Sequence, residues 1–158
     1  PDTIMTAINA IVSGELPPPG STIALEKSVC DECKRTKSEK PTIEGFVRPQ
    51  FLIPDPDKCL LEQGFTCMGS ATRGGCGALC PSVNMPCRGC YGPMPRAMDM
   101  GADNLAAMSS IIAAADEAEV SQKAAKLPDP LGTFYRFTLP VSMLGRIPRD
   151  RLAGSEKE

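Results

Sequence analysis

Eight cysteines, all between Cys30 and Cys90, constrain the fold of this chain more than any other feature of its sequence. The stretch 21–96 around them shows no long helical or alternating periodicity and is interrupted repeatedly by proline and glycine. The 158 residues include 14 Gly and 16 Pro, but only 4% are aromatic. Because such a stretch has little apolar material for a hydrophobic core, we expect its cysteines to hold it together.

Disulfides, zinc and iron–sulfur clusters are the three ways in which these cysteines could do so. Disulfides are the least favoured, since they need an oxidising compartment and nothing in the sequence signals export. Zinc ribbons usually have two CxxC pairs per site, whereas here Cys30/Cys33 and Cys87/Cys90 are the only such pairs among eight cysteines. Eight thiolates divide evenly into two 4Fe–4S sites, and the Cys80-Pro81 pair is typical of ferredoxin-type runs. The spacing favours iron–sulfur clusters and leaves zinc as the rival.

Composition also excludes several classes of function. The chain has no His, which rules out mixed Cys/His zinc sites and histidine-based catalysis within it. Its net charge of −2 argues against a general nucleic-acid binder. No apolar run approaches the length of a transmembrane helix, and no signal peptide opens the chain, so we expect neither a membrane nor an exported location.

Regular structure is expected mainly outside the cysteine-bearing stretch. Residues 2–13 have apolar residues on one helical face and end at Gly14, and a helix this short needs a packing partner. Residues 102–126 predict one longer helix, stopped by Pro128. Residues 132–139 hold three of the seven aromatic side chains and predict a short strand or an extended docking arm. The expected fold class is therefore small and irregular, mainly α with few strands.

Three segments carry a resemblance to a known family. They are PDPDKCLLEQG at 54–64, CMGSATRGGCGALC at 67–80 and NMPCRGCYGP at 84–93. Together they closely resemble the small, electron-transferring subunit of cytoplasmic NiFe hydrogenases, in particular the methyl-viologen-reducing type that serves heterodisulfide reductase. In that family a flavodoxin-like domain holding a proximal cluster is followed by a section with a medial and a distal cluster.

The resemblance implies a ligand set for each of two 4Fe–4S clusters. The distal cluster would be held by Cys30, Cys33, Cys59 and Cys67, and the medial cluster by Cys76, Cys80, Cys87 and Cys90. The best-known periplasmic members have a His where Cys30 stands and a Pro where Cys80 stands, which gives them a three-iron medial cluster. A fourth thiolate at Cys80 implies a complete medial cube and a relay of lower potential.

The resemblance also implies a domain plan. The opening Pro1-Asp-Thr-Ile4 looks like the helix that follows the proximal-cluster domain, so residues 1–20 are expected to be a linking helix after a missing or separate flavodoxin-like domain. Residues 21–96 would form the two-cluster domain, with a third, proximal cluster expected outside this chain. Residues 97–158 would be a C-terminal helix and docking tail, and the last residues, 154–158, are expected to fray.

The function implied is an electron relay in a cytoplasmic oxidoreductase, with no catalytic side chain in this chain. Electrons from H2 oxidation would arrive from the NiFe large subunit and leave to an iron–sulfur or flavin partner of the heterodisulfide reductase type. Two alternatives stay open: a zinc-organised assembly module with four-cysteine sites, and an iron–sulfur relay of a related oxidoreductase that does not use H2.

Basic residues beside the cysteines have two interpretations each. Lys34, Arg35, Lys37 and Lys40 follow Cys33 and could steer an acidic electron acceptor, but a solvated loop is the favoured interpretation because acidic residues intervene. Arg73 and Arg88 could raise a cluster potential or simply hold loop backbone.

Overall fold

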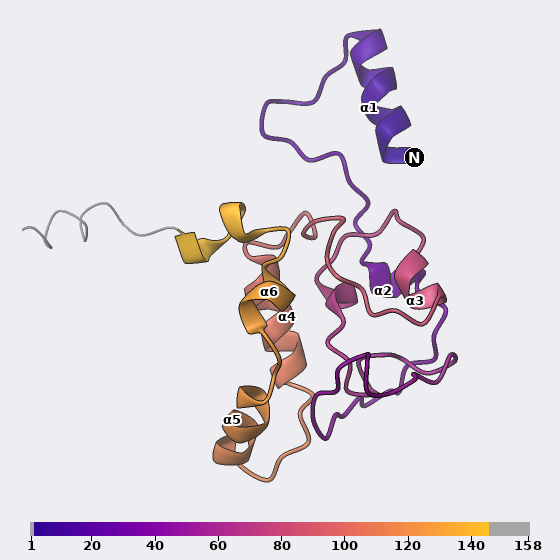
Figure 1. The fold of residues 1–158 in the computed structure, drawn as a ribbon. Helices are drawn as coiled ribbons and strands as arrows, with labels where there is room; N and C mark the ends of the chain where they lie inside the picture. The colour runs from indigo at the N-terminus through magenta and orange to yellow at the C-terminus, as the bar shows by residue number, and fades with distance from the viewer. Residues whose placement is uncertain (1, 146–158) are drawn as a thin grey trace, which may run out of the picture.

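The computed structural model describes residues 2–145 as short helices joined by long irregular loops. Its elements, in chain order, are α1 (Asp2–Ser13), α2 (Val29–Glu32), η1 (Met68–Ser70), α3 (Leu79–Ser82), α4 (Met100–Ser109), α5 (Glu117–Ala125), α6 (Pro130–Phe134), η2 (Leu139–Val141) and η3 (Met143–Gly145). Figure 1 shows α4, α5 and α6 along one side of the body, with α2, α3 and the cysteine-bearing loops along the other. The small, irregular and mainly helical character expected from the sequence is confirmed.

The few strands that were expected are not found in residues 2–145. Backbone pairing there is limited to isolated β-bridges, such as Ser28 with Arg73, Thr36 with Lys58 and Ile43 with Ile112. The prolines and glycines of this section explain the difference, because proline cannot donate to a ladder and glycine weakens a strand interior.

Helix α1 forms where it was expected, but its apolar face is not packed. It stands apart from the body at the end of an extended connection (Figure 1), and none of its residues is buried. Ile4 and Ile11 are more than half exposed. The nearest apolar surface is the connection itself, since Ala7 and Ile11 share a groove with Leu16 and the following prolines. The prediction that this helix packs against a core is therefore wrong within residues 2–145.

The single helix expected over 102–126 is two helices with a break between them. Helix α4 begins at Met100, where the Asp99 carboxylate accepts a hydrogen bond from the Ala102 N–H at 2.9 Å. After Ser109 the chain instead pairs with Ile43, which donates to the Ile111 carbonyl and accepts from the Ala113 N–H. Asp116 then caps α5 by accepting from the Glu119 N–H at 2.8 Å. A tertiary pairing and a new N-cap thus override the continuous helical pattern.

Residues 132–139 form neither the expected strand nor an extended arm. Asp129 caps α6 through the Gly132 N–H, and Pro130 occupies the first helical turn, where it fits well. Helix α6 packs against α4, and its Phe134 is buried in the core. Phe137 stays about half exposed. Phe134 therefore packs on α4. The tail beyond residue 145, where fraying was expected, lies outside the described residues.

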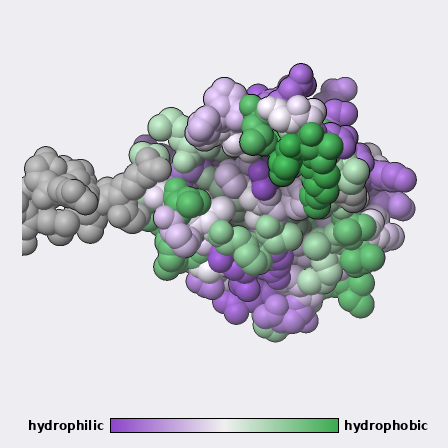
Figure 2. All heavy atoms as spheres, turned by 90° about the horizontal axis from the view of Figure 1, so that it is seen from above, coloured by the Kyte–Doolittle hydropathy of each residue, from purple (hydrophilic) through white to green (hydrophobic). Residues whose placement is uncertain are grey.

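A small hydrophobic core does exist beside the cysteines, contrary to the expectation of a stretch without one. Phe65, Leu60, Met68 and Val29 are almost completely buried, and they join Met100, Met108 and Phe134 from the C-terminal helices. Cys67 and Cys87 belong to the same cluster. The remaining apolar side chains include many exposed ones, which form separate green patches in Figure 2. Within residues 2–145, no helix has both the length and the apolar character needed to cross a membrane.

Candidate functional site

Four cysteines from three separate segments line one small cavity. They are Cys30, Cys33, Cys59 and Cys67, the same four that the family resemblance assigns to the distal cluster. The other lining residues are apolar or cationic: Val29, Leu60, Gly69, Pro81, Arg35 and Lys37. No carboxylate lines the cavity, so its chemistry is that of thiols facing positive charge.

Helix α2 fixes the first pair of these cysteines. Ser28 and Asp31 form a capping box in which the Asp31 carboxylate accepts from both the Ser28 N–H and its hydroxyl. These bonds, the backbone one foremost, lower the pKa of Asp31. The Val29 N–H donates to the Thr72 carbonyl at 2.9 Å, which attaches the start of α2 to the loop before Cys76. Cys30 and Cys33 are therefore held by contacts both within and beyond their own turn.

A short parallel bridge brings Cys59 to this pair. The Cys59 N–H donates to the Thr36 carbonyl, and the Thr36 N–H donates to the Asp57 carbonyl. The amide of Gln63 organises the same loop, since it accepts from the Asp55 N–H and donates to the Lys58 carbonyl. Sequence reasoning missed Gln63, because nothing in the pattern separates it from an ordinary polar loop residue.

Cys67 lies at the junction of the two cysteine sets. Its Sγ accepts hydrogen bonds from the N–H groups of Gly69 and Cys87, the latter at 3.3 Å. A Cβ added to Gly69 would lie 3.0 Å from the Cys30 Sγ and 3.7 Å from the Cys67 Sγ. The missing side chain at Gly69 thus leaves room beside two sulfurs and lets a backbone N–H reach one of them.

Burial and mutual repulsion both oppose ionisation of these thiols. Burial is the main cause of the raised pKa of Cys67, which is about 12; the neighbouring Cys87 and Cys30 add to the rise, and two backbone hydrogen bonds oppose it. Burial likewise raises the pKa of Cys30 to about 11, although Lys37 opposes the shift. Several thiolates cannot coexist at such a site unless a positively charged group binds them.

The four remaining cysteines, Cys76, Cys80, Cys87 and Cys90, are less closely assembled. Burial is the main cause of the raised pKa of Cys87, and Cys76 and Cys80 lie near enough to raise it further. Cys80 and Cys90 are exposed, whereas Cys87 is buried. Among the described contacts none joins the Cys90 sulfur to the other three. Cys76 and Cys80 thus lie close to Cys87 in space.

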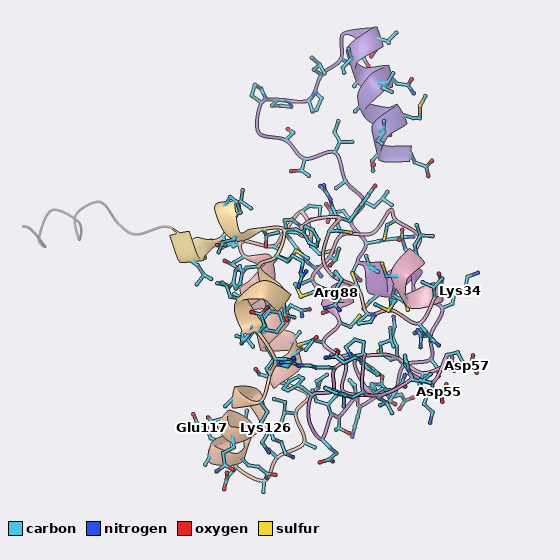
Figure 3. All side chains as sticks on the ribbon, in the orientation of Figure 1. Lys34, Asp55, Asp57, Arg88, Glu117 and Lys126 are labelled. Atoms are coloured by element: carbon cyan, nitrogen blue, oxygen red, sulfur yellow. The ribbon has the colours of Figure 1, made fainter. Side chains whose placement is uncertain are left out.

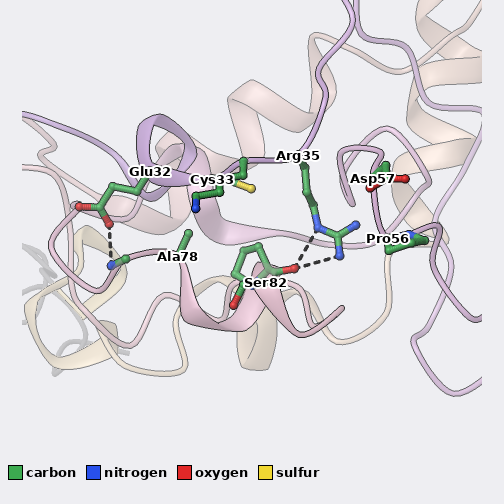
Figure 4. A pocket seen from close by; sticks show the side chains of 10 residues that line it. Glu32, Cys33, Arg35, Pro56, Asp57, Ala78 and Ser82 are labelled. Atoms are coloured by element: carbon green, nitrogen blue, oxygen red, sulfur yellow. Dashed lines mark hydrogen bonds between the residues drawn. The ribbon is translucent and has the colours of Figure 1, made fainter.

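Glu32 connects the two sets of cysteines. Its carboxylate accepts from the Gly75 N–H at 2.7 Å and from the Gly77 N–H at 2.9 Å, on either side of Cys76; Figure 4 shows the bond to Gly77. A side chain next to Cys33 therefore holds the loop that carries Cys76. Sequence reasoning missed this role too, since Glu32 looks like one more charge on a solvated loop.

The basic residues divide into two groups. Arg73 donates to the Tyr91 carbonyl at 2.6 Å and lies over the Tyr91 ring, which is the loop-holding role. Arg88 is half-buried and lies toward the middle of the molecule (Figure 3). Lys34 is exposed and points outward at the edge in Figure 3, as a solvated loop requires. Arg35 is buried instead, so the solvated-loop interpretation is wrong for this residue.

The donor set fits an iron–sulfur group in two respects. All eight cysteines are thiols and none forms a disulfide. The cavity combines soft sulfur donors, backbone N–H groups aimed at sulfur and an apolar wall, the surroundings that tune cluster potentials in proteins. Within residues 2–145, no three His, Cys, Asp or Glu side chains come close enough together to hold a single metal ion.

No protein-family model matches the chain, but curated proteins do. It is 41% identical over 149 residues to the iron-sulfur subunit of the F420-non-reducing hydrogenase of Archaeoglobus profundus, covering 92% of this chain and 46% of that protein. It is 43% identical over 146 residues to a subunit of the vhu F420-non-reducing hydrogenase of Methanocaldococcus jannaschii, again covering 92% of this chain and 46% of the relative.

The chain thus spans about half the length of these two relatives. A shorter relative, a subunit of the F420-non-reducing hydrogenase of Methanothermus fervidus, is 42% identical over 118 residues, which is 72% of this chain and 93% of that protein. The resemblance drawn from residues 54–93 is confirmed by these matches. On this likeness and on its cysteine pattern, the chain belongs to the family of F420-non-reducing hydrogenase iron-sulfur subunits.

Proposed function

We propose that this chain is the electron-relay section of a cytoplasmic NiFe hydrogenase and that its eight cysteines hold two 4Fe–4S clusters. One observation carries the proposal: four cysteines that are distant in sequence line a single cavity free of carboxylates. Family membership supports the hydrogenase context. When bound, the clusters would supply one-electron carriers, which this chain's side chains cannot provide by themselves.

Each set of cysteines has its own support. Cys30, Cys33, Cys59 and Cys67 share the cavity and are proposed as the distal ligands. Cys76, Cys80, Cys87 and Cys90 are proposed as the medial ligands, supported by the proximity of the first three. Backbone N–H groups two residues after a cysteine, at Gly69 and Gly89, donate to the Cys67 and Cys87 sulfurs. Such bonds stabilise negative charge on sulfur and raise a cluster's potential.

The side on which electrons leave is proposed from the position of Cys33. This residue borders the four-cysteine cavity and also a second pocket that contains Glu32, Lys34, Asp57 and Ser82 (Figure 4). A redox partner seated in this pocket would thus be separated from the distal site by the Cys33 side chain. We propose an iron–sulfur or flavin subunit of the heterodisulfide reductase type as that partner, and the NiFe large subunit as the electron donor.

The domain plan is part of the same proposal. Residues 21–96 form the two-cluster domain, residues 1–20 link it to a flavodoxin-like domain with a proximal cluster, and residues 97–158 form the C-terminal helices and docking tail. Exposed apolar side chains on α1 and at Phe51 and Ile53 support contacts with neighbouring domains or subunits.

Metal analysis of anaerobically purified protein tests the proposal directly. We expect about eight iron atoms and about eight sulfides for the eight cysteines, little zinc, and cubane EPR signals on reduction. Colourless protein carrying about two zinc ions would instead establish the zinc-organised module. Protein with iron and sulfide but no copurifying nickel-containing subunit would favour the relay of an oxidoreductase that does not use H2.

A further inference from the structure

Arg35 is a buried guanidinium whose hydrogen-bond partners are all neutral. Only 9% of the residue is exposed. Its Nε and one terminal nitrogen donate to the Pro81 carbonyl at 3.0 and 2.9 Å, and its other terminal nitrogen donates to the carbonyls of Asp55 and Lys58. The amide oxygen of Asn84 accepts the remaining bond. Every donor direction is thus used, but no partner carries a charge that offsets the cation.

No carboxylate pairs with Arg35 among the described residues. The ion pairs there are Lys58 with Asp55, and Lys123 with Glu44 and Glu119. The Arg35 charge is one of the causes that lower the pKa of Asp55, but that carboxylate accepts from the Asp57 N–H and pairs with Lys58. Glu32 is directed to the N–H groups of Gly75 and Gly77. A buried charge without a directly paired counter-charge is costly, so an anion bound beside Arg35 would stabilise it.

The position of Arg35 identifies that anion. Its side chain lines the cavity formed by Cys30, Cys33, Cys59 and Cys67. It also holds the carbonyl of Pro81, the residue after Cys80 (Figure 4), and so connects the first cysteine set to the second. Lys37 also lines the cavity, but it is exposed and its charge is therefore screened by solvent. Of the two cations that line the cavity, Arg35 is the buried one.

We propose that Arg35 is a positioning residue that sets the reduction equilibrium of the distal site through its buried positive charge. This inference rests on the proposed function, because it requires an anionic four-thiolate cluster in the cavity. Reduction of such a site adds one electron and no atoms, so the site becomes more negative by one charge. A nearby buried cation favours the reduced form, since charges separated by several ångströms in a protein interior interact by well over the thermal energy.

A single isosteric substitution tests the charge without removing the arginine. Asn84→Asp places a carboxylate next to the Arg35 guanidinium and keeps the side-chain oxygen that already accepts a hydrogen bond from it. Asn84 has φ +64°, a conformation that Asp tolerates well. The matched control is Val83→Asp, which adds the same charge one residue away on a side chain that is 71% exposed.

The measurement is an EPR-monitored redox titration of the anaerobically purified complex, with iron content determined on the same samples. The Cys80→Pro variant identifies the medial signal, so the distal signal can be followed separately. We expect Asn84→Asp to lower the reduced-to-oxidised ratio of the distal site about tenfold at a fixed potential, which is about 59 mV for a one-electron couple. Val83→Asp is expected to change that ratio by less than about twofold, because its charge is screened.

The outcomes separate this inference from the proposed function. Wild-type protein without iron and sulfide overturns both. Wild-type iron content with equal distal shifts in Asn84→Asp and Val83→Asp overturns only the role of Arg35. If Asn84→Asp loses the distal iron, the Arg35→Lys variant decides between the two roles of Arg35. Full iron content with a near-wild-type potential in Arg35→Lys supports the role of the positive charge. Loss of the distal iron in Arg35→Lys shows that only the hydrogen bonds of the guanidinium matter and overturns the inference.

Discussion

The two sets of cysteines differ in how far the protein itself assembles them. Cys30, Cys33, Cys59 and Cys67 line one cavity and are buried or partly buried, whereas Cys80 and Cys90 of the second set are exposed. The first set is brought together by long-range contacts, notably those from Val29 to Thr72 and from Cys59 to Thr36. The polypeptide therefore fixes the first site largely by its own folding, and leaves the second site open.

Local backbone geometry explains why the second set is looser. The stretch 75–92 contains Ala78, Asn84 and four glycines at positive φ, so its path is a series of tight turns rather than a packed element. Its cysteines are close in sequence, which keeps the entropy cost of gathering them around a cofactor small. A site of this kind can be completed when its ligand binds, as many metal sites are.

Loss of Cys67 should have the largest effect, because this thiol contacts both sets. We expect Cys67→Ala to reduce the iron content from about eight atoms to about four or fewer, since the distal site loses a ligand and the Cys87 N–H loses its acceptor. The matched variant Cys90→Ala removes an exposed thiol from the second set and should leave the distal EPR signal unchanged. Iron analysis and EPR on both variants measure the difference.

The opposite result would remove the contrast between the two sites. If Cys90→Ala abolishes the distal signal, or if Cys67→Ala leaves both signals intact, the cysteines are not divided as proposed.

A smaller change is expected at Cys80, where an open site should tolerate loss of one ligand. Cys80→Pro should convert the medial site to a three-iron cluster, lowering the iron content from about eight to about seven atoms and leaving the distal signal intact. Proline fits here, because Cys80 lies in the first turn of α3 and its N–H needs no helical acceptor. EPR of the oxidised protein detects the three-iron signal.

The control for this substitution is Cys80→Ala, which removes the thiolate without adding a ring. It should give the same three-iron signal. A medial spectrum that is unchanged in both variants would contradict the assignment of Cys80 as a ligand.

The sequence predicted the parts of this molecule that depend on residue type and spacing. The short helix at 2–13 follows from apolar periodicity. The family pattern named four cysteines that line one cavity, Cys30, Cys33, Cys59 and Cys67, and their role as cluster ligands stays a prediction. The prediction of one helix over 102–126 is wrong, because the helix is interrupted where Ile43 pairs with Ile111 and Ala113. That contact joins residues far apart in the chain, so no local pattern in the helix reveals it.

Side-chain roles near the site were the least predictable. Arg35 and Lys34 are neighbours of the same charge, yet one is buried and the other exposed. The difference arises from where the carbonyls of Asp55, Lys58 and Pro81 lie in three dimensions. Likewise, the role of Glu32 depends on the N–H groups of a loop more than forty residues away. Spacing can identify candidate ligands but not the residues that hold them.

Substitutions at two glycines compare crowding at the first site with backbone strain at the second. Gly69→Ala would place a Cβ 3.0 Å from the Cys30 Sγ, so we expect a partial loss of the distal iron and its EPR signal. Gly77→Ala meets no atom within 4 Å but has φ +66°, so it should cost about 1 kcal/mol of stability and leave the iron content unchanged. Full distal occupancy in Gly69→Ala would show that the cavity is less constrained than its contacts indicate.

The smallest effect on either site is expected from Asp99, which lies outside both and stabilises the C-terminal helices. Its carboxylate accepts from the N–H groups of Ala102 and Met143 at 2.9 and 2.7 Å. Burial raises the pKa of Asp99, but these bonds and one from Tyr135 outweigh it, so the net pKa is below the ordinary value. Asp99→Asn keeps one acceptor oxygen and should cost about 1–3 kcal/mol of unfolding free energy, with the iron content unchanged.

The pH dependence of that loss follows from the sign of the shift. A carboxyl group with a lowered folded pKa contributes stability above its unfolded pKa and loses it as the pH falls through the folded pKa. The difference between wild type and Asp99→Asn should therefore be constant from about pH 8 to about pH 5 and shrink only below about pH 4. Native-state hydrogen exchange of the α4 amides measures this difference in stability. The control is Asp116→Asn, which changes an exposed N-cap that accepts one hydrogen bond in α5 and should therefore have a smaller effect. A difference that already declines between pH 8 and pH 5 would mean that another group titrates with α4. The C-terminal helices would then be coupled to ionisation elsewhere in the molecule and would not be an independent support for the two sites.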